Sequence, residues 1–161
     1  MNNVVYGYKC FNKNLTSQYG DIFKEGETYH SSNPHFGKNG FHMCKRLEDT
    51  LRYFDAFNDE IEIAYVKGFG NIHESFDDYN EYYDMYSVEN LEIIHILSRD
   101  EIINYALLLS DVRVKRFISL FKLTNEEIAL FREKYKNNNY VLESIKYYQT
   151  EEFKNLIKKR K

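Results

Sequence analysis

EIEIAYV, at residues 60–66, is the stretch that decides the predicted fold. Polar and apolar residues alternate through it, and a period of two is typical of a half-buried β-strand. The pattern predicts that Ile61, Ile63 and Tyr65 face the core. The segment KGFG, at residues 67–70, is expected to end the strand because its glycines favour turns and irregular backbone.

Other segments extend this strand into a sheet. VVYGYKCF (4–11) alternates in the same way, GFHMC (40–44) follows turn residues, and LEIIHIL (91–97) is apolar enough for a central strand. KEGETYH (24–30) is a further strand candidate. Apolar residues at helical spacing predict a helix over 47–54.

From Ser98 onward the apolar residues recur at helical spacing. Two pairs match the capping box, in which side chains bond the free amides of a helix start: Ser98 with Glu101, and Thr124 with Glu127. The C-terminal part is therefore expected to be a series of short helices.

The chain has 161 residues, of which 43% are hydrophobic and 17% aromatic, enough to pack one ordinary core. The predicted fold class is α+β. We expect an N-terminal antiparallel or mixed sheet with one or two packed helices over residues 1–97, followed by a helical C-terminal region, residues 98–161, docked on it. With 15 Tyr, 12 Phe and a single Pro, the composition resembles coding by the AT-rich genome of a low-GC bacterium or its phage.

No apolar run approaches the roughly 18 residues that a membrane span needs. The start MNNVVYGYK lacks the basic and apolar regions of a signal peptide. Cys10 and Cys44 are therefore expected to be reduced thiols. These features predict a cytoplasmic protein, inside the host cell, with no membrane partner.

The formal net charge of −3 divides unevenly along the chain. Residues 1–97 carry −8, whereas residues 98–161 carry +5. Opposite charges of this size could draw the two halves together, or each half could address a different partner.

The acidic segment HESFDDYNEYYDMYSVENLE, residues 73–92, carries seven Asp or Glu residues and no Lys or Arg. Its charge would attract a basic surface, and its tyrosines would supply rigid contact area. The predicted partner-binding residues are Glu74, Asp77, Asp78, Tyr79, Glu81, Tyr82, Tyr83, Asp84 and Tyr86. The alternative is a solvated loop whose tyrosines fold back on the core.

Metal binding and direct nucleic-acid binding are not expected. Zinc needs four N or S ligands, and the two cysteines, Cys10 and Cys44, form no C-x-x-C pair. The basic residues of the C-terminal half are mixed with acidic ones and no stacking motif accompanies them, which favours a solubilising surface.

Three motifs in order carry a family resemblance: G-Y-K-x-F, K-E-G-E-T-Y and G-F-H-x-C. Over about residues 6–100 the chain resembles a family of small uncharacterised proteins of bacterial genomes and prophages. The resemblance implies association with mobile elements and supplies no activity. The helical part lies outside it.

A second likeness is to the ADP-ribosyltransferase fold. Y-H-S-S, starting at Tyr29, is similar to a His-containing start, and F-G-K-N-G-F-H-M-C to the G-aromatic element that follows. The likeness implies that His30 holds NAD, that Phe41 lies beside the nicotinamide, and that Glu89 or Glu92 is the glutamate of the site. Lys9 stands at a strand position where Arg is expected.

The sequence therefore favours a phage or mobile-element-associated interaction protein of the inhibitor or anti-defence type, working without a cofactor. Its expected partner is a host protein with a basic surface, such as a nucleic-acid-binding protein, contacted through the acidic segment. The alternative is an ADP-ribosyltransferase-like enzyme that uses NAD to modify a host protein. The partner's identity, the oligomeric state, enzymatic activity and the role of the C-terminal helices stay open.

Overall fold

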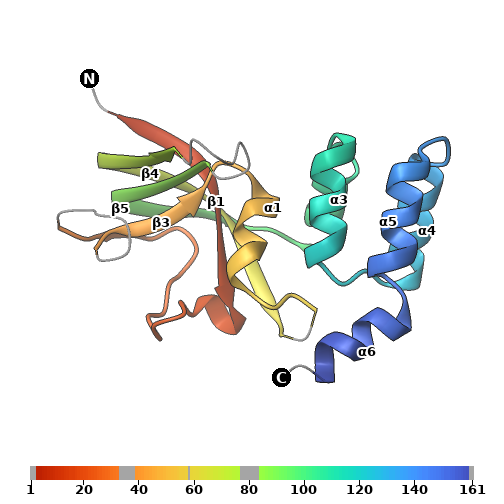
Figure 1. The fold of residues 1–161 in the computed structure, drawn as a ribbon. Coiled ribbons are helices and arrows are strands. Elements are labelled where there is room, and N and C mark those ends of the chain that lie inside the picture. The colour runs from red at the N-terminus through yellow and green to blue at the C-terminus, as the bar shows by residue number, and fades with distance from the viewer. Residues whose placement is uncertain (1–2, 33–38, 58, 77–83, 160–161) are drawn as a thin grey trace. The chain divides into compact units, whose positions relative to one another are not determined.

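The computed structural model describes residues 3–32, 39–57, 59–76 and 84–159. The fold is α+β: an antiparallel sheet in the N-terminal part precedes a helical C-terminal part, which confirms the predicted class (Figure 1). The chain divides into two compact units. The sheet unit comprises Met1–Phe54 and Glu60–Leu97, and the helical unit comprises Asp55–Asp59 and Ser98–Lys161.

The sheet has five strands in the order β2-β5-β3-β1-β4, with a further pairing of β5 with β4. The strands are β1 (Val4–Asn12), β2 (Thr28–His30), β3 (Phe41–Cys44), β4 (Ile61–Phe76) and β5 (Asp84–Ile96). Because β4 also pairs with β5, the pairings run β1–β4–β5–β3 and back to β1. The sheet therefore curls until β1 and β3 meet, and their one described register pair is Tyr8 with Cys44.

The strands β4 and β5 are longer than the sequence predicted. Residues 67–70 do not end β4; instead the register shifts between Phe69 and Ile72, and the strand continues as a hairpin with β5. Gly70 supplies the positive φ of 85° at this irregularity. Gly70, which the sequence pattern assigned to a strand end, therefore lies in a β-bulge within β4.

The inward face of β4 also differs from the prediction. Ala64 and Val66 are fully buried and belong to the hydrophobic core cluster. Tyr65 instead stacks with Tyr6, with ring centroids 6.0 Å apart, and is half-buried. Ile63 is fully buried as predicted, so both faces of β4 are covered at this point and simple alternation could not assign them.

Gly7 and Gly68 allow the core to close where the sheet curls. A Cβ on Gly7 would overlap the carbonyl oxygen of Cys44, and one on Gly68 would lie 2.9 Å from the Met43 sulfur. Met43 is 1% exposed in the core between these strands. The glycine of GYKCF is therefore required by the close approach of β3 to β1.

Short helical segments flank the sheet: the 3-10 turn η1 (Lys13–Leu15) follows β1, and α1 (Leu47–Thr50) and η2 (Leu51–Tyr53) follow β3. Leu47 and Leu51 are fully buried, and α1 contacts β1 and β3. The predicted helix over 47–54 is thus confirmed as one short α-helical turn that tightens into a 3-10 turn.

The helical unit contains α2 (Arg99–Ala106), α3 (Asp111–Leu120), α4 (Asn125–Lys134), α5 (Asn139–Tyr148) and α6 (Glu151–Lys159). Both predicted capping boxes are present, at the starts of α2 and α4. Phe117 is buried in the core of this unit: its ring centroid lies 4.9 Å from that of Phe121 and 6.2 Å from that of Phe131. In the described part of the chain, no helix is both long and apolar enough to cross a membrane.

Buried polar contacts join the helices of this unit. The Gln149 amide donates to the carbonyls of Ile118 at 2.6 Å and Phe121 at 2.9 Å, and accepts from the amide of Leu123 at 3.0 Å. Gln149 follows α5 and is 5% exposed, so it satisfies the backbone groups of the α3–α4 connection where water is excluded.

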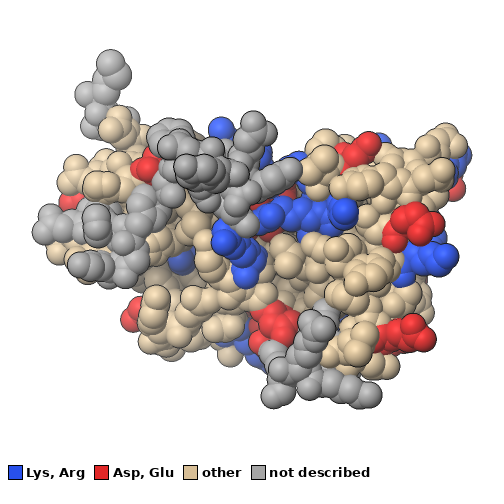
Figure 2. Space-filling model, viewed as in Figure 1, with Lys and Arg blue, Asp and Glu red and all other residues tan. Residues whose placement is uncertain are grey.

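On the face drawn in Figure 2, Lys/Arg and Asp/Glu side chains both appear over the helical half.

Candidate functional site: an open pocket in the sheet unit

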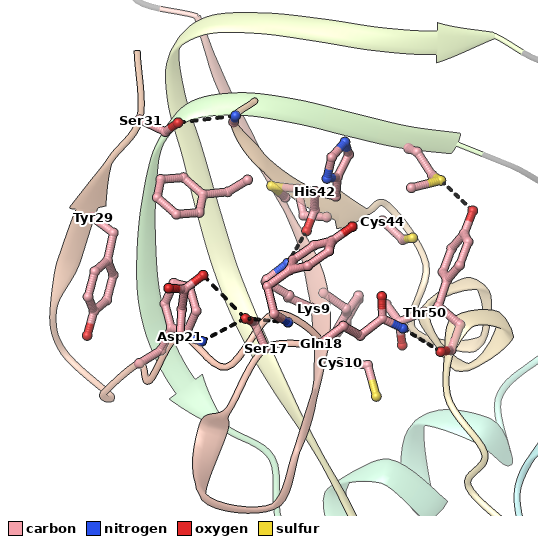
Figure 3. Close-up of a pocket in the computed structure, with 18 of the residues that line it drawn as sticks. Lys9, Cys10, Ser17, Gln18, Asp21, Tyr29, Ser31, His42, Cys44 and Thr50 are labelled. Carbon is pink, nitrogen blue, oxygen red and sulfur yellow. Dashed lines mark hydrogen bonds between the residues drawn. The ribbon is translucent and has the colours of Figure 1, made fainter. Parts of the chain in front are cut away.

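An open pocket of about 930 Å³ lies in the sheet unit (Figure 3). Its wall combines segments that are far apart in the sequence: residues 8–10, part of the loop 17–23, residues 29–31, 39–44, Thr50, Tyr53, Phe54 and Met85. Lys9 and His42 lie between Tyr29 and Asp21 on one side and Thr50 on the other. The volume is typical of a small-molecule site.

The strand pairing explains why a pocket forms here. Beyond the register pair of Tyr8 with Cys44, the structure gives no further β1–β3 pair among the described residues. The Lys9 side chain joins the two strands instead, because its ammonium donates to the His42 carbonyl at 2.7 Å. A side chain thus satisfies a backbone acceptor at the edge of β3, and open space remains around it.

Lys9 is the one Lys or Arg among the described lining residues, and Asp21 is the one carboxylate. The His42 carbonyl is the one hydrogen-bond acceptor that the described residues offer to the Lys9 ammonium. Burial lowers the pKa of Lys9 to about 8, against the opposing effect of the thiols of Cys44 and Cys10. The Phe11 ring, 5.6 Å from Nζ, stabilises the charged form.

Aromatic rings form one wall of the pocket. The Phe23 ring lies 4.7 Å from the Tyr29 ring and 6.0 Å from the Phe41 ring, both in edge-on contact. Phe23 is buried, whereas Tyr29 and Phe41 are half-buried. This wall offers apolar area that could contact a flat organic group.

The loop after η1 is held by local hydrogen bonds. Ser17 Oγ accepts from the amides of Tyr19 at 3.2 Å and Asp21 at 3.1 Å. The Gln18 side chain donates to the Tyr53 carbonyl at 2.7 Å, which fixes this loop to the segment after α1. The loop therefore has a defined conformation at the pocket wall.

Three other titratable groups of the pocket, His42, Cys10 and Tyr8, have pKa values shifted in favour of their neutral forms. Burial, and then the nearby Lys9 ammonium, lowers the pKa of His42, so its imidazole is neutral at pH 7. Burial raises the pKa of the Cys10 thiol, which disfavours the reactive thiolate. Burial, and then Tyr65 and Glu48, raises the pKa of Tyr8. Of these four groups, Lys9 is the one that exchanges between its charged and neutral forms near pH 8.

The residues of the NAD-binding alternative are distributed unevenly. His30 and Phe41 both line the pocket. Glu89 and Glu92 are not among its described lining residues: Glu89 accepts from the Asn71 amide at 2.9 Å, and Glu92 lies 4.0 Å from the Lys67 ammonium. His30 pairs with Asn90 and Thr28 with Glu92, so His30 and Glu92 share one face of the sheet by register.

Within the acidic segment, residues 73–76 belong to β4 and residues 84–92 to β5, whereas residues 77–83 lie outside the described residues. These include the predicted contacts Asp77, Asp78, Tyr79, Glu81, Tyr82 and Tyr83. Glu74 is exposed on β4, and Asp84 begins β5. Tyr86 is 9% exposed and packs in the hydrophobic core cluster, so its ring stabilises the sheet.

The histidines and cysteines do not assemble into a metal site in the described part of the chain, where no three His, Cys, Asp or Glu side chains form a suitable group. Lys9, Tyr8 and Tyr53 are lining residues that the predicted sites omit. The sequence signal that could have identified Lys9 is its position among aromatic residues in an alternating strand. Nothing local indicates that Tyr53 joins the same pocket.

The fold and the pocket define a class: a small α+β domain whose curled antiparallel sheet carries an open pocket of ligand size. The chain belongs to the family described as a domain of unknown function (DUF7666), whose profile matches residues 5–104. Every described lining residue of the pocket falls within that range. No curated protein and no solved structure was found to match the chain.

Proposed function

We propose that the sheet unit binds a small, flat organic ligand that presents an oxygen acceptor, anionic or carbonyl, to Lys9. The observation that carries this proposal is the Lys9 ammonium itself, which lines the pocket and has one hydrogen-bond acceptor, the His42 carbonyl, among the described residues. An ammonium has three donors, and buried lysines are rarely left without a counter-charge. A ligand oxygen would accept a hydrogen bond from one of the remaining donors, and an anionic oxygen would also supply the counter-charge.

The aromatic residues of the pocket wall support the proposal that the ligand is flat. Tyr29 and Phe41 offer half-buried aromatic surface, and His30 and Asp21 add polar groups at the pocket wall. Aromatic surface combined with polar groups is a common feature of small-molecule sites. With one lysine and one carboxylate in the described lining, the pocket favours a ligand with few charges.

The nicotinamide end of NAD fits this description, and the likeness to the ADP-ribosyltransferase fold makes NAD the first compound to test. Its nicotinamide ring is flat and its carboxamide and phosphates are oxygen acceptors. The presence of both His30 and Phe41 in the pocket lining supports this choice, whereas Glu89 and Glu92 would have to act from outside the described lining. Transfer of ADP-ribose to a host protein is then the corresponding activity.

Calorimetric titration with NAD, nicotinamide mononucleotide and nicotinamide tests the proposal. Loss of a charge-assisted hydrogen bond should make Lys9→Met bind the best ligand about tenfold more weakly or worse. Lys45→Met, which removes an exposed lysine beside β3, is the matched control and should bind as the wild type does. Equal affinity in both variants would contradict the assignment to Lys9.

A second candidate function rests on charge. Residues 1–97 carry −8, and the β4–β5 hairpin bears the acidic segment, with Glu74 exposed. These features support a phage or mobile-element protein of the inhibitor or anti-defence type that binds a basic host protein. Reversal of charge at Asp77, Asp78, Glu81 and Asp84 should abolish capture of that partner from host lysate. Reversal at Lys9 alone should leave the capture intact, and the opposite pattern would exclude this function.

A further inference from the structure

The Lys9 amine is positioned as a nucleophile as well as a hydrogen-bond donor. It lies on β1, lines the open pocket and is held by the His42 carbonyl at 2.7 Å. No Asp or Glu of the described residues forms an ion pair with it, and the burial of the amine outweighs the Phe11 ring and the thiols of Cys10 and Cys44, which favour the charged form. A lysine in such a weakly polar setting loses its proton readily and becomes reactive.

We propose that Lys9 forms an imine with a ligand that carries an aldehyde or ketone on a flat ring. The proposal rests on the proposed ligand-binding function of the pocket and specifies its substrate class: a carbonyl compound whose carbonyl oxygen faces Lys9.

The step balances without an oxidant or a reductant. The nitrogen lone pair attacks the carbonyl carbon, and a proton passes from nitrogen to the carbonyl oxygen to give a carbinolamine. Loss of one water then leaves the C=N bond. His42 lines the same pocket and its imidazole is neutral at pH 7, and the proposal assigns it to accept and return the proton.

Reductive trapping tests this inference on the full chain. We would incubate the protein with a limiting amount of 4-formylbenzoate and cyanoborohydride at pH 7.5, and locate the label by peptide mapping. The hydride reduces an imine to a stable secondary amine. At this pH a far larger fraction of the Lys9 side chain is neutral amine than in a lysine with the ordinary pKa. Lys9 should therefore be labelled at least about tenfold faster than exposed Lys45.

A second arm separates this inference from the proposed binding function. Benzoate has the same ring and acid group without the carbonyl, and its binding is followed by NMR. If benzoate binds the pocket but Lys9 is labelled no faster than Lys45, the imine is excluded and ligand binding stands. If benzoate does not bind the pocket and Lys9 is labelled no faster than Lys45, both proposals are contradicted. Lys9→Arg should lose the label at position 9, with labelling of Lys45 unchanged.

Discussion

The Lys9 ammonium donates to the His42 carbonyl at 2.7 Å, and this bond joins β1 to β3 just beyond their one described register pair. The contact links the two motifs GYKCF and GFHMC in space. It also keeps a lysine in a pocket whose other described lining residues include no Lys or Arg. The proposed ligand site follows from this relationship.

The first prediction concerns the titration of Lys9. NMR of the lysine side chains should give Lys9 a pKa of about 8, because burial disfavours its charged form. Between this value and the ordinary value of 10.5, the unfolded chain binds more protons than the folded chain, so the Lys9 contribution to stability rises with pH in this window. Lys9 titrating together with the other lysines would contradict the description of its environment.

The second prediction concerns Gly7. Gly7→Ala should lower the free energy of unfolding by about 1–3 kcal/mol or more, because the added methyl group overlaps the Cys44 carbonyl. Gly20→Ala is the contrast: its Cβ meets nothing within 4 Å, but its φ is +91°. That variant should cost only the backbone strain of about 1–2 kcal/mol and leave the pocket unchanged. Urea unfolding and NMR spectra distinguish the two effects.

The third prediction concerns Gln149. Gln149→Leu strands two carbonyls and one amide in the helical unit, and it should cost about 2–4 kcal/mol in urea unfolding. Gln18→Leu is the matched control, since Gln18 also donates to a carbonyl but is exposed. Its cost should stay below about 1 kcal/mol, because water can replace an exposed donor. Equal costs would mean that burial does not determine the contribution of these bonds.

The fourth prediction concerns the pH dependence of the helical unit. Burial raises the pKa of Glu127, but hydrogen bonds from Arg99 and Thr124 outweigh it, so the pKa lies below the ordinary 4.5. The resulting stabilisation is present above pH 4.5 and is lost as the pH falls through the lowered value. Glu127→Gln should therefore lower the melting temperature at pH 7 and lose most of that difference near pH 3.

Glu126 supplies the control for this measurement. It lies in the same first turn of α4 and is exposed. Glu126→Gln should leave the melting temperature within about a degree of the wild type at both pH values, because exposed charges contribute little. A similar effect of both variants would assign the pH dependence to the helix dipole rather than to the Arg99 pair.

Local signals predicted much of the fold. The capping boxes at Ser98 and Thr124 marked helix starts correctly because the bonds involve residues only three positions apart. The alternation over 4–11 predicted β1 for a similar reason. The continuation of β4 past Gly70 could not be read in this way, since the bulge exists only because β5 pairs with the strand on both sides of it.

The candidate site depends on contacts between distant parts of the chain. Lys9 and His42 are 33 positions apart, and their contact exists because β1 and β3 meet when the sheet curls. Tyr86 illustrates the same limit: in the sequence it is one of several tyrosines among acidic residues, and burial in the core distinguishes it only in the folded chain. Sequence composition therefore named candidate residues without showing which of them share a pocket.

The most direct test of the ligand-binding account is chemical-shift mapping with a library of flat, acceptor-bearing fragments on isotope-labelled protein. The account predicts that the tightest fragments shift the amides of residues 8–10 and 41–44 together, and that Lys9→Met weakens them about tenfold or more while Lys45→Met does not. Fragments that gather elsewhere on the chain, or that bind Lys9→Met as tightly as the wild type, would contradict it.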